Sequence, residues 1–261
     1  MSAIEVVTVV VPARNEEQSL KRCLDSIAAA RRQVEVMRGA GAPRIQVVLI
    51  ADSCTDGTAT IAAAERDVLV EIVDFASVGA ARGHGVLVAL GMGDAVPRAQ
   101  WIANTDADSV VPVNWLVHQL DHADAGVDLV IGTVRPDPSG MTVEQQREWD
   151  STRTPGRPNG HVHGANLGIR ATSYLRAGGF RDQREHEDND LVARVVRSGA
   201  LSVASDVAEV ETSSRRYGRT PGGYAGYLRA LDARAHAART ASEGPSSPAA
   251  ETVVVPMVDL V

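Results

Sequence analysis

The chain has little of several features that mark large classes of protein. Its 261 residues include two cysteines, Cys23 and Cys54, whose spacing fits neither a metal site nor the disulfide framework of a small secreted protein. Aromatic residues make up 3% of the chain, which has 26 Lys and Arg and 33 Asp and Glu. Because nucleic-acid-binding modules need a basic face and aromatic stacking platforms, we expect no nucleic-acid partner.

Long apolar runs are absent as well. No window approaches the run of about 18 apolar residues that a membrane-spanning helix requires, so we expect no integral membrane segment. Residues 1–12 lack the basic start and the small-residue cleavage site of a signal peptide. With both cysteines interpreted as reduced thiols, these absences predict a cytoplasmic protein, which would have to visit the membrane surface if its acceptor were a lipid.

Strand-like and helix-like patterns alternate along the first half of the chain. Residues 6–11 (VVTVVV) form a continuous β-branched run, which is typical of a strand covered on both faces in a parallel sheet. The expected strands are 6–11, 45–51, 68–73, 101–103 and 128–133, and the expected helices are 19–30, 58–65, 79–90 and 188–198. Alternating units of this length predict an α/β fold with a mostly parallel central sheet flanked by helices.

The regular alternation stops at residues 135–160, which hold four prolines and several charges. This stretch is interpreted as a long loop that carries one helix near residues 142–152. Residues 241–250 are rich in Ser, Pro and Ala and predict the start of a flexible tail.

Two carboxylates, Asp106 and Asp108, follow the short strand expected at 101–103. Alternate residues of an extended segment point the same way, so both side chains are expected to face one cation at the carboxyl edge of the sheet. One or two carboxylates, completed by substrate phosphates, make the usual protein site for Mg²⁺ or Mn²⁺ on a diphosphate. A lone pair of this kind is more often a solvated acidic turn, so the metal interpretation depends on other motifs.

A second acidic cluster, residues 186–191 (HEDNDL), opens an apolar helix. Acidic residues in a first helical turn are stabilised by the helix dipole, which by itself accounts for them. The alternative is that one of these carboxylates acts as general base toward an acceptor hydroxyl.

Three glycines lie close to Arg82 in the sequence. Gly79, Gly83 and Gly85 predict a backbone that approaches a ligand closely, with the arginine offered to a phosphate. The first strand is not followed by the G-x-G-x-x-G pattern, which argues against a dinucleotide-dependent dehydrogenase.

Taken in order, these motifs resemble those of the family 2 glycosyltransferases. The resemblance is carried by residues 9–16 (VVVPARNE), 52–58 (DSCTDGT), 79–85 (GAARGHG), 106–108 (DAD), 164–170 (GANLGIR), 178–180 (GGF) and 187–199 (EDNDLVARVVRSG). It implies a single Rossmann-like domain of the GT-A type over residues 1–240. In that domain residues 1–110 would form the nucleotide-binding half and 111–240 the acceptor-binding half, ahead of a flexible tail at 241–261.

The resemblance also implies roles for single residues. Asp188 corresponds to the catalytic base, and Asp108 together with Asp106 to the ligands of a Mn²⁺ or Mg²⁺ cofactor. The residues expected at the nucleotide are Pro12, Ala13, Asn15, Glu16, Asp52, Arg82 and Asp106. The residues expected at the donor sugar or its phosphate are Gly164, Ala165, Asn166 and Glu187.

Three further features lie outside those motifs. Residues 213–219 (SSRRYGR) are basic in an acidic chain and form either a solvated loop or a lid whose Arg215 or Arg216 closes over the diphosphate; we assign Arg216 to the donor phosphate. His161 and His163 are either solvated or in contact with substrate. Trp149 is the aromatic residue expected on the acceptor side.

Together the residues and the resemblance predict a metal-dependent, inverting glycosyltransferase. Its nucleotide-sugar donor carries UDP as a first choice or GDP as a second, and its acceptor is a hydroxyl of a small or lipid-linked molecule. The alternatives are a nucleotidyltransferase on a related fold, although residues 13–18 lack a glycine-rich triphosphate loop, and a non-catalytic nucleotide-sugar-binding domain.

Overall fold

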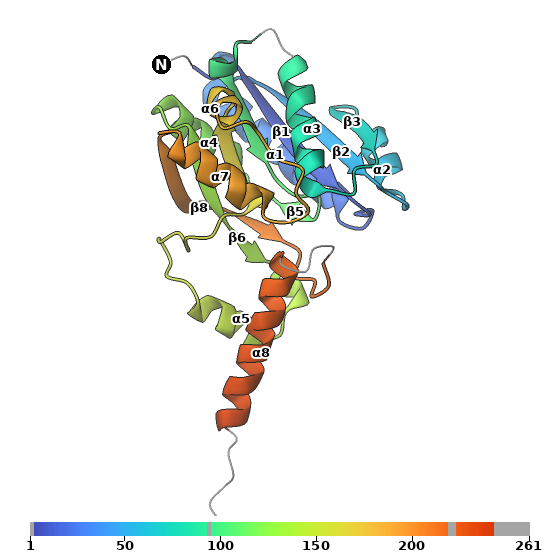
Figure 1. Cartoon of the computed structure of the whole chain (residues 1–261), viewed down its shortest axis with the longest axis vertical. Helices are drawn as coiled ribbons and strands as arrows, with labels where there is room; N and C mark the ends of the chain where they lie inside the picture. The colour runs from blue at the N-terminus through green and yellow to red at the C-terminus, as the bar shows by residue number, and fades with distance from the viewer. Residues whose placement is uncertain (1–2, 93–94, 219–222, 243–261) are drawn as a thin grey trace, which may run out of the picture.

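The computed structural model describes residues 3–92, 95–218 and 223–242. One eight-stranded sheet runs in the order β3-β2-β1-β4-β7-β6-β8-β5 (Figure 1). Its strands are β1 (Val6–Ala13), β2 (Arg44–Asp52), β3 (Val68–Val73), β4 (Gln100–Asn104), β5 (Ser109–Val110), β6 (Leu129–Pro136), β7 (Leu167–Arg170) and β8 (Ser202–Thr212). The α-helices are α1 (Leu20–Arg38), α2 (Thr58–Ala64), α3 (Val78–Gly91), α4 (Trp115–Asp124), α5 (Val143–Ser151), α6 (Ala171–Arg176), α7 (Glu187–Arg197) and α8 (Tyr224–Ser242).

The sheet is parallel through β3, β2, β1 and β4, and again between β6 and β8. Only β7 and β5 run antiparallel to their neighbours among the described strands. The predicted α/β class and mostly parallel sheet are therefore confirmed. Among the helices of the described ranges, none combines the length and the apolar composition needed to cross a membrane.

Helices cover both faces of the sheet, and β1 shows why its sequence has no alternation. Val7, Val9 and Val11 pack in the cluster formed with α1, α2 and α4, while Val10 packs in the cluster formed with α3, α6 and α7. Because the side chains of a strand alternate between faces, a strand buried on both faces needs apolar residues at every position.

The glycines around Arg82 serve packing. All three lie within α3, and a Cβ on Gly79 would come 2.2 Å from the carbonyl oxygen of Arg181. A Cβ on Gly85 would come 2.7 Å from Cγ1 of Val10. The expectation that these glycines bring backbone to a ligand is corrected: Gly79 and Gly85 let α3 approach the loop before α7 and the sheet.

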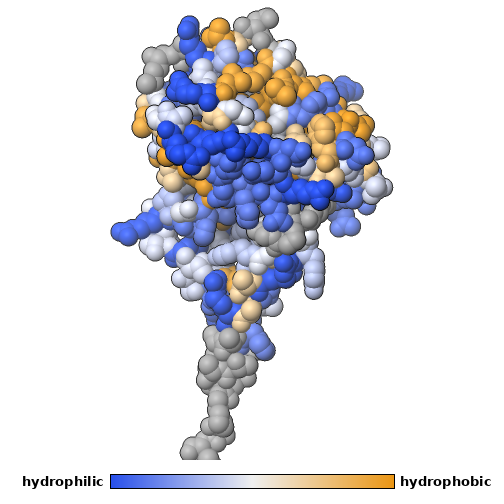
Figure 2. Space-filling view, viewed as in Figure 1, coloured by the Kyte–Doolittle hydropathy of each residue, from blue (hydrophilic) through white to orange (hydrophobic). Residues whose placement is uncertain are grey.

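The irregular stretch at 135–160 is confirmed in part. Its expected helix is α5, which begins with a capping box between Thr142 and Gln145. Six further elements have no counterpart among the expected ones: α4, β5, β7, α6, β8 and α8. Figure 1 shows α5 and α8 projecting together from one edge of the sheet, and Gln145 donates to Asp232 of α8 at 2.8 Å. Figure 2 shows mostly hydrophilic residues where this extension joins the body.

The division into two halves stays a prediction. Of the tail expected at 241–261, residues 241 and 242 end α8, and the rest lies outside the described residues.

Asn166 holds three elements together at the centre of the molecule. Its Oδ1 accepts from the Trp115 indole at 2.9 Å, and its Nδ2 donates to the carbonyls of Thr133 and Ala208, each at 2.9 Å. The residue is 2% exposed, so water cannot replace these partners.

Asn166→Ala is expected to lower the free energy of unfolding by about 2–4 kcal/mol, because it leaves one indole N–H and two carbonyls buried without partners. Chemical denaturation of the variant measures this. Asn114→Ala is the matched control, since within the described residues the Asn114 side chain makes one hydrogen bond, of 3.4 Å, at the surface. Equal losses for the two variants would contradict the role given to Asn166.

Candidate active site

A cavity of about 760 Å³ opens at the carboxyl ends of β1, β2 and β4, which is where ligands bind in open parallel sheets. The expected site residues that line it are Pro12, Ala13, Glu16, Asp52, Arg82, Asp106, Asp108, Gly164, Ala165, Glu187 and Asp188. Asn15, Asn166 and Arg216 are not on its wall. The cavity thus gathers residues from segments far apart in the sequence.

Arg82 lines the cavity although only 2% of its surface is exposed. Its Nε donates to Glu187 at 3.1 Å, one terminal nitrogen donates to the Gly164 carbonyl at 3.1 Å, and the other pairs with Asp106. Burial opposes the charge, but Asp106 and Glu187 outweigh it, and the pKa of Arg82 lies above its ordinary value. In this structure Arg82 positions protein groups, which differs from the nucleotide contact expected of it.

The contacts of Arg82 also hold the first turn of α7 in place. Its N-cap residue, His186, adopts a left-handed conformation with φ of 61°. Burial raises the pKa of Glu187 above its ordinary value, against the opposing effect of Arg82. The next residue, Asp188, is half-buried, and its Oδ2 accepts from the Gly164 amide at 2.7 Å. Asn189 donates to the other oxygen, Oδ1, from its amide at 2.7 Å and from Nδ2 at 3.0 Å. Arg82 therefore holds Glu187, the neighbour of Asp188 in the chain, and Gly164, whose amide bonds one oxygen of the Asp188 carboxylate.

Asp106 and Asp108 do not lie on one extended segment. β4 ends at Asn104, and the amide of Ser109 donates to the Asp106 carbonyl at 3.0 Å, which closes a turn. The predicted geometry is wrong for that reason. Asp106 pairs with Arg82 and Asp108 pairs with Arg215, although both carboxylates line the cavity.

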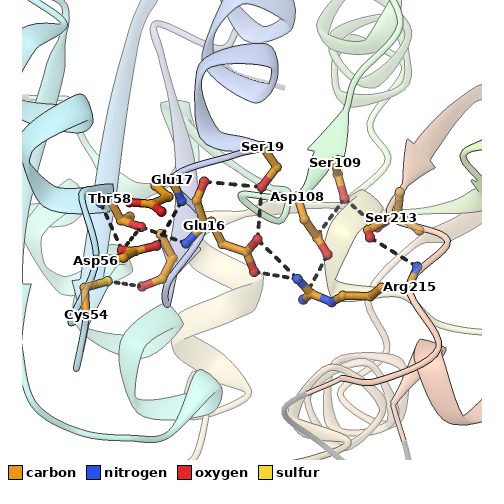
Figure 3. Close-up of polar contacts among 12 residues, drawn as sticks. Glu16, Glu17, Ser19, Cys54, Asp56, Thr58, Asp108, Ser109, Ser213 and Arg215 are labelled. Atoms are coloured by element: carbon orange, nitrogen blue, oxygen red, sulfur yellow. Dashed lines mark hydrogen bonds and ion pairs between the residues drawn. The ribbon is translucent and has the colours of Figure 1, made fainter. Parts of the chain in front are cut away.

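Figure 3 shows Arg215 reaching between two carboxylates at the cavity wall. Its terminal nitrogens lie 2.9 Å from Oε1 of Glu16 and 3.0 Å from Oδ2 of Asp108. Burial lowers the pKa of Arg215, but the two carboxylates raise it by more, so the net shift is upward. Arg216, which we assigned to the donor phosphate, instead pairs with Asp232 of α8 at 2.7 Å. Residues 219–222 of the same basic segment lie outside the described residues.

Asp52 shapes the loop between β3 and α3. Its carboxylate accepts from the amides of Phe75, Ala76 and Ser77 at 2.7, 2.9 and 3.0 Å. Asn15, with φ of 53°, accepts from the Thr55 amide at 2.7 Å and fixes the loop after β2. Both side chains organise the edge of the cavity near the end of β1.

Four arginines of the cavity wall were missed by sequence reasoning: Arg14, Arg184, and two that form ion pairs, Arg153 with Glu209 and Arg234 with Glu148. Arg14 follows β1, and Arg184 precedes α7 next to Gln183, whose carbonyl accepts from Gly79 of α3. Neither has an ion-pair or hydrogen-bond partner within the described residues. A single arginine in a loop carries no pattern that would single it out.

The residues present fit a divalent cation held jointly with a diphosphate. In the part of the chain that the structure describes, no three His, Cys, Asp or Glu side chains gather into a metal site of their own. Such a cation needs only one or two protein carboxylates, which Asp108 and Asp106 offer. The guanidinium of Arg215 between Asp108 and Glu16 indicates that a positive charge is stabilised at this position.

Solved structures with this arrangement of strands and helices include glycosyltransferases. The structure of TarS 1–349 from S. aureus in complex with UDP-GlcNAc superposes with a TM-score of 0.60 at 17% identity, covering 84% of this chain and 61% of that one. The mannosyltransferase PcManGT of Pyrobaculum calidifontis, in complex with GDP-Man and Mn²⁺, gives a TM-score of 0.55 at 22% identity, covering 93% and 66%. At these identities the likeness shows the fold.

A relative of similar sequence is the undecaprenyl-phosphate 4-deoxy-4-formamido-L-arabinose transferase of Pseudomonas fluorescens, which is 34% identical over 137 residues. The match covers 51% of this chain, and it spans only 36% of the length of that relative. Residues 8–180 match the model of glycosyl transferase family 2, which is more than half of the chain. The chain therefore belongs to glycosyl transferase family 2.

Proposed function

We propose that this protein is a metal-dependent, inverting glycosyltransferase that uses a nucleotide diphosphate sugar as donor. The observation that carries the proposal is the common cavity: the residues expected at the metal, the residue expected at the acceptor proton, and all the residues expected at the nucleotide except Asn15 line one space of about 760 Å³. The Arg82 network, which ties Asp106 to Glu187 and Gly164, supports their acting as one site.

The ligands of the structural neighbours support the donor class. TarS binds UDP-GlcNAc and PcManGT binds GDP-Man with Mn²⁺. We keep UDP as the first choice and GDP as the second, with Mn²⁺ or Mg²⁺ as cofactor. Cys23 and Cys54 are free thiols in the structure, which supports the cytoplasm as the expected compartment.

The charged end of the cavity suits the donor. We assign the nucleoside to the edge formed by Pro12, Ala13 and Asp52, and the diphosphate to the region of Asp108 and Arg215. A guanidinium matches phosphate oxygens as a fork of donors. A divalent cation held by Asp108 and Asp106 would neutralise charge on the departing diphosphate.

Asp188 performs the proton transfer in this proposal. Its Oδ2 is fixed by the Gly164 amide, and its position on the cavity wall leaves it accessible to an acceptor hydroxyl. Asp188 takes the hydroxyl proton while the acceptor oxygen forms a bond to the anomeric carbon of the donor sugar. The bond from that carbon to the diphosphate oxygen breaks on the opposite face, which inverts the configuration.

Asp188→Asn is expected to lower kcat by roughly a hundredfold or more, because the amide cannot accept the proton. Nucleotide binding should be unchanged, since Asp188 is not assigned to the nucleotide. The matched control is Asp190→Asn in the same helical turn, where the carboxylate pairs with Arg194 at 2.8 Å. Release of nucleoside diphosphate measures turnover, and wild-type turnover by Asp188→Asn would contradict the assignment.

Calorimetry tests the donor site. We expect UDP or GDP to bind in the presence of Mn²⁺ and to lose most of that affinity when the metal is chelated. Asp108→Ala should abolish the metal-dependent part, whereas Asp67→Ala, at a carboxylate with 80% of its side chain exposed, should not. Failure of both nucleotides to bind wild-type protein with Mn²⁺ would count against the donor site and favour a non-catalytic domain.

A further inference from the structure

One wall of the cavity is aromatic in a chain that is poor in aromatics. The sequence has three Trp, four Tyr and two Phe, and Trp149, Tyr224 and Tyr227 all line this wall. His161 and His163 join them. Ring centroids lie 5.8 Å apart for His163 and Tyr224, 5.8 Å for Tyr224 and Tyr227, and 6.1 Å for His161 and Tyr227. These five residues, from α5, α8 and the segment before Gly164, are called the aromatic wall.

Two polar groups of the aromatic wall are buried with hydrogen-bonding capacity unused. Within the described residues, Nε2 of His163 has no hydrogen-bond partner, and the Tyr224 hydroxyl has no acceptor for its proton. Trp149 contacts that hydroxyl, but its indole N–H can only donate, so the contact does not satisfy the Tyr224 proton. Buried polar groups are nearly always paired in folded proteins. Two groups with unused capacity on one cavity wall indicate a ligand that pairs with them.

The aromatic wall is also uncharged where it is buried. Burial lowers the pKa of His163 to about 4, so its ring is neutral at neutral pH. The two arginines beside the wall are already paired, Arg153 with Glu209 at 2.5 Å and Arg234 with Glu148 at 3.6 Å. The two cavity arginines that have no partner within the described residues, Arg14 and Arg184, belong to the segments after β1 and before α7. This wall therefore suits a neutral hydroxylated molecule better than a phosphate.

The wall adjoins the proposed base. Gly164, whose amide donates to Asp188 at 2.7 Å, directly follows His163 in the chain. The Asp188 charge also acts on the His163 ring, where it opposes the fall in the pKa caused by burial, and both residues line the cavity. A molecule bonded to the His163 ring is therefore close to the Asp188 carboxylate.

We propose that the aromatic wall binds the acceptor, and that the acceptor is a neutral, hydroxyl-rich ring such as a sugar or a cyclitol. His163 Nε2 and the Tyr224 hydroxyl each bond one hydroxyl of that ring, and a further hydroxyl faces Asp188. This inference rests on the proposed function, because it takes Asp188 as the group that accepts the acceptor proton.

The test uses the full chain with Mn²⁺ and, in turn, UDP-glucose, UDP-GlcNAc and GDP-mannose. Release of UDP or GDP is measured with two kinds of acceptor: methyl glucoside, methyl mannoside and myo-inositol as neutral rings, and citronellyl phosphate in detergent as a prenyl phosphate. At least one neutral ring is expected to accelerate release. His163→Phe and Tyr224→Phe should each raise the KM for that ring by roughly three- to tenfold, the loss of one hydrogen bond.

Tyr217→Phe is the matched control, because Tyr217 is 87% exposed, and it should leave the KM unchanged. Nucleotide affinity of His163→Phe and Tyr224→Phe, measured by calorimetry, should stay at the wild-type value, which shows that the variants are folded. Acceleration by citronellyl phosphate alone, no acceleration by any neutral ring, or an unchanged KM in both variants would overturn the inference. Those outcomes leave metal-dependent nucleotide binding intact, whereas failure of the proposed function would abolish it.

Discussion

The buried guanidinium of Arg82 is the interaction on which the cavity depends. Removing a charge from water is costly, and the cost is offset only by well-placed charged and hydrogen-bonding partners. Each of the three nitrogens of Arg82 has one: Glu187, the Gly164 carbonyl and Asp106, which lie at the start of α7, before β7 and after β4. One side chain thus sets the relative positions of three segments that are far apart in the sequence, and the Asp188 carboxylate takes its orientation from two of them.

The two ends of the cavity differ in chemistry, and that difference is the basis of both proposals. Toward β1 and β2 the wall carries Glu16, Asp52 and Asp108 with Arg215 between two of the carboxylates (Figure 3). Toward α5 and α8 it carries aromatic rings and paired arginines. The charged end would suit a donor that carries a diphosphate, and the aromatic end would suit an uncharged acceptor. Asp188 would then lie between the donor and the acceptor.

The sequence predicted the fold correctly where the local pattern of apolar and capping residues agrees with the burial in the folded protein. The run at residues 6–11 is apolar at every position because β1 is covered on both faces, and the helix near 142–152 carries its own capping box. Contacts between distant segments were not readable. The turn at Asp106, the choice of Arg215 over Arg216 and the structural bonds of Asn166 depend on which groups the fold brings together, and no spacing in the sequence reports that. The glycines of α3 gave a wrong prediction for the same reason: Gly79 and Gly85 were expected near a ligand, but both pack against protein atoms.

The most direct test of this account is a crystal structure of the protein with Mn²⁺ and whichever of UDP or GDP binds. The account predicts the diphosphate beside Asp108, with the contacts from Arg82 to Asp106, Glu187 and Gly164 unchanged. A nucleotide bound outside the cavity, or an Arg82 that leaves its carboxylates to contact the phosphates, would contradict it.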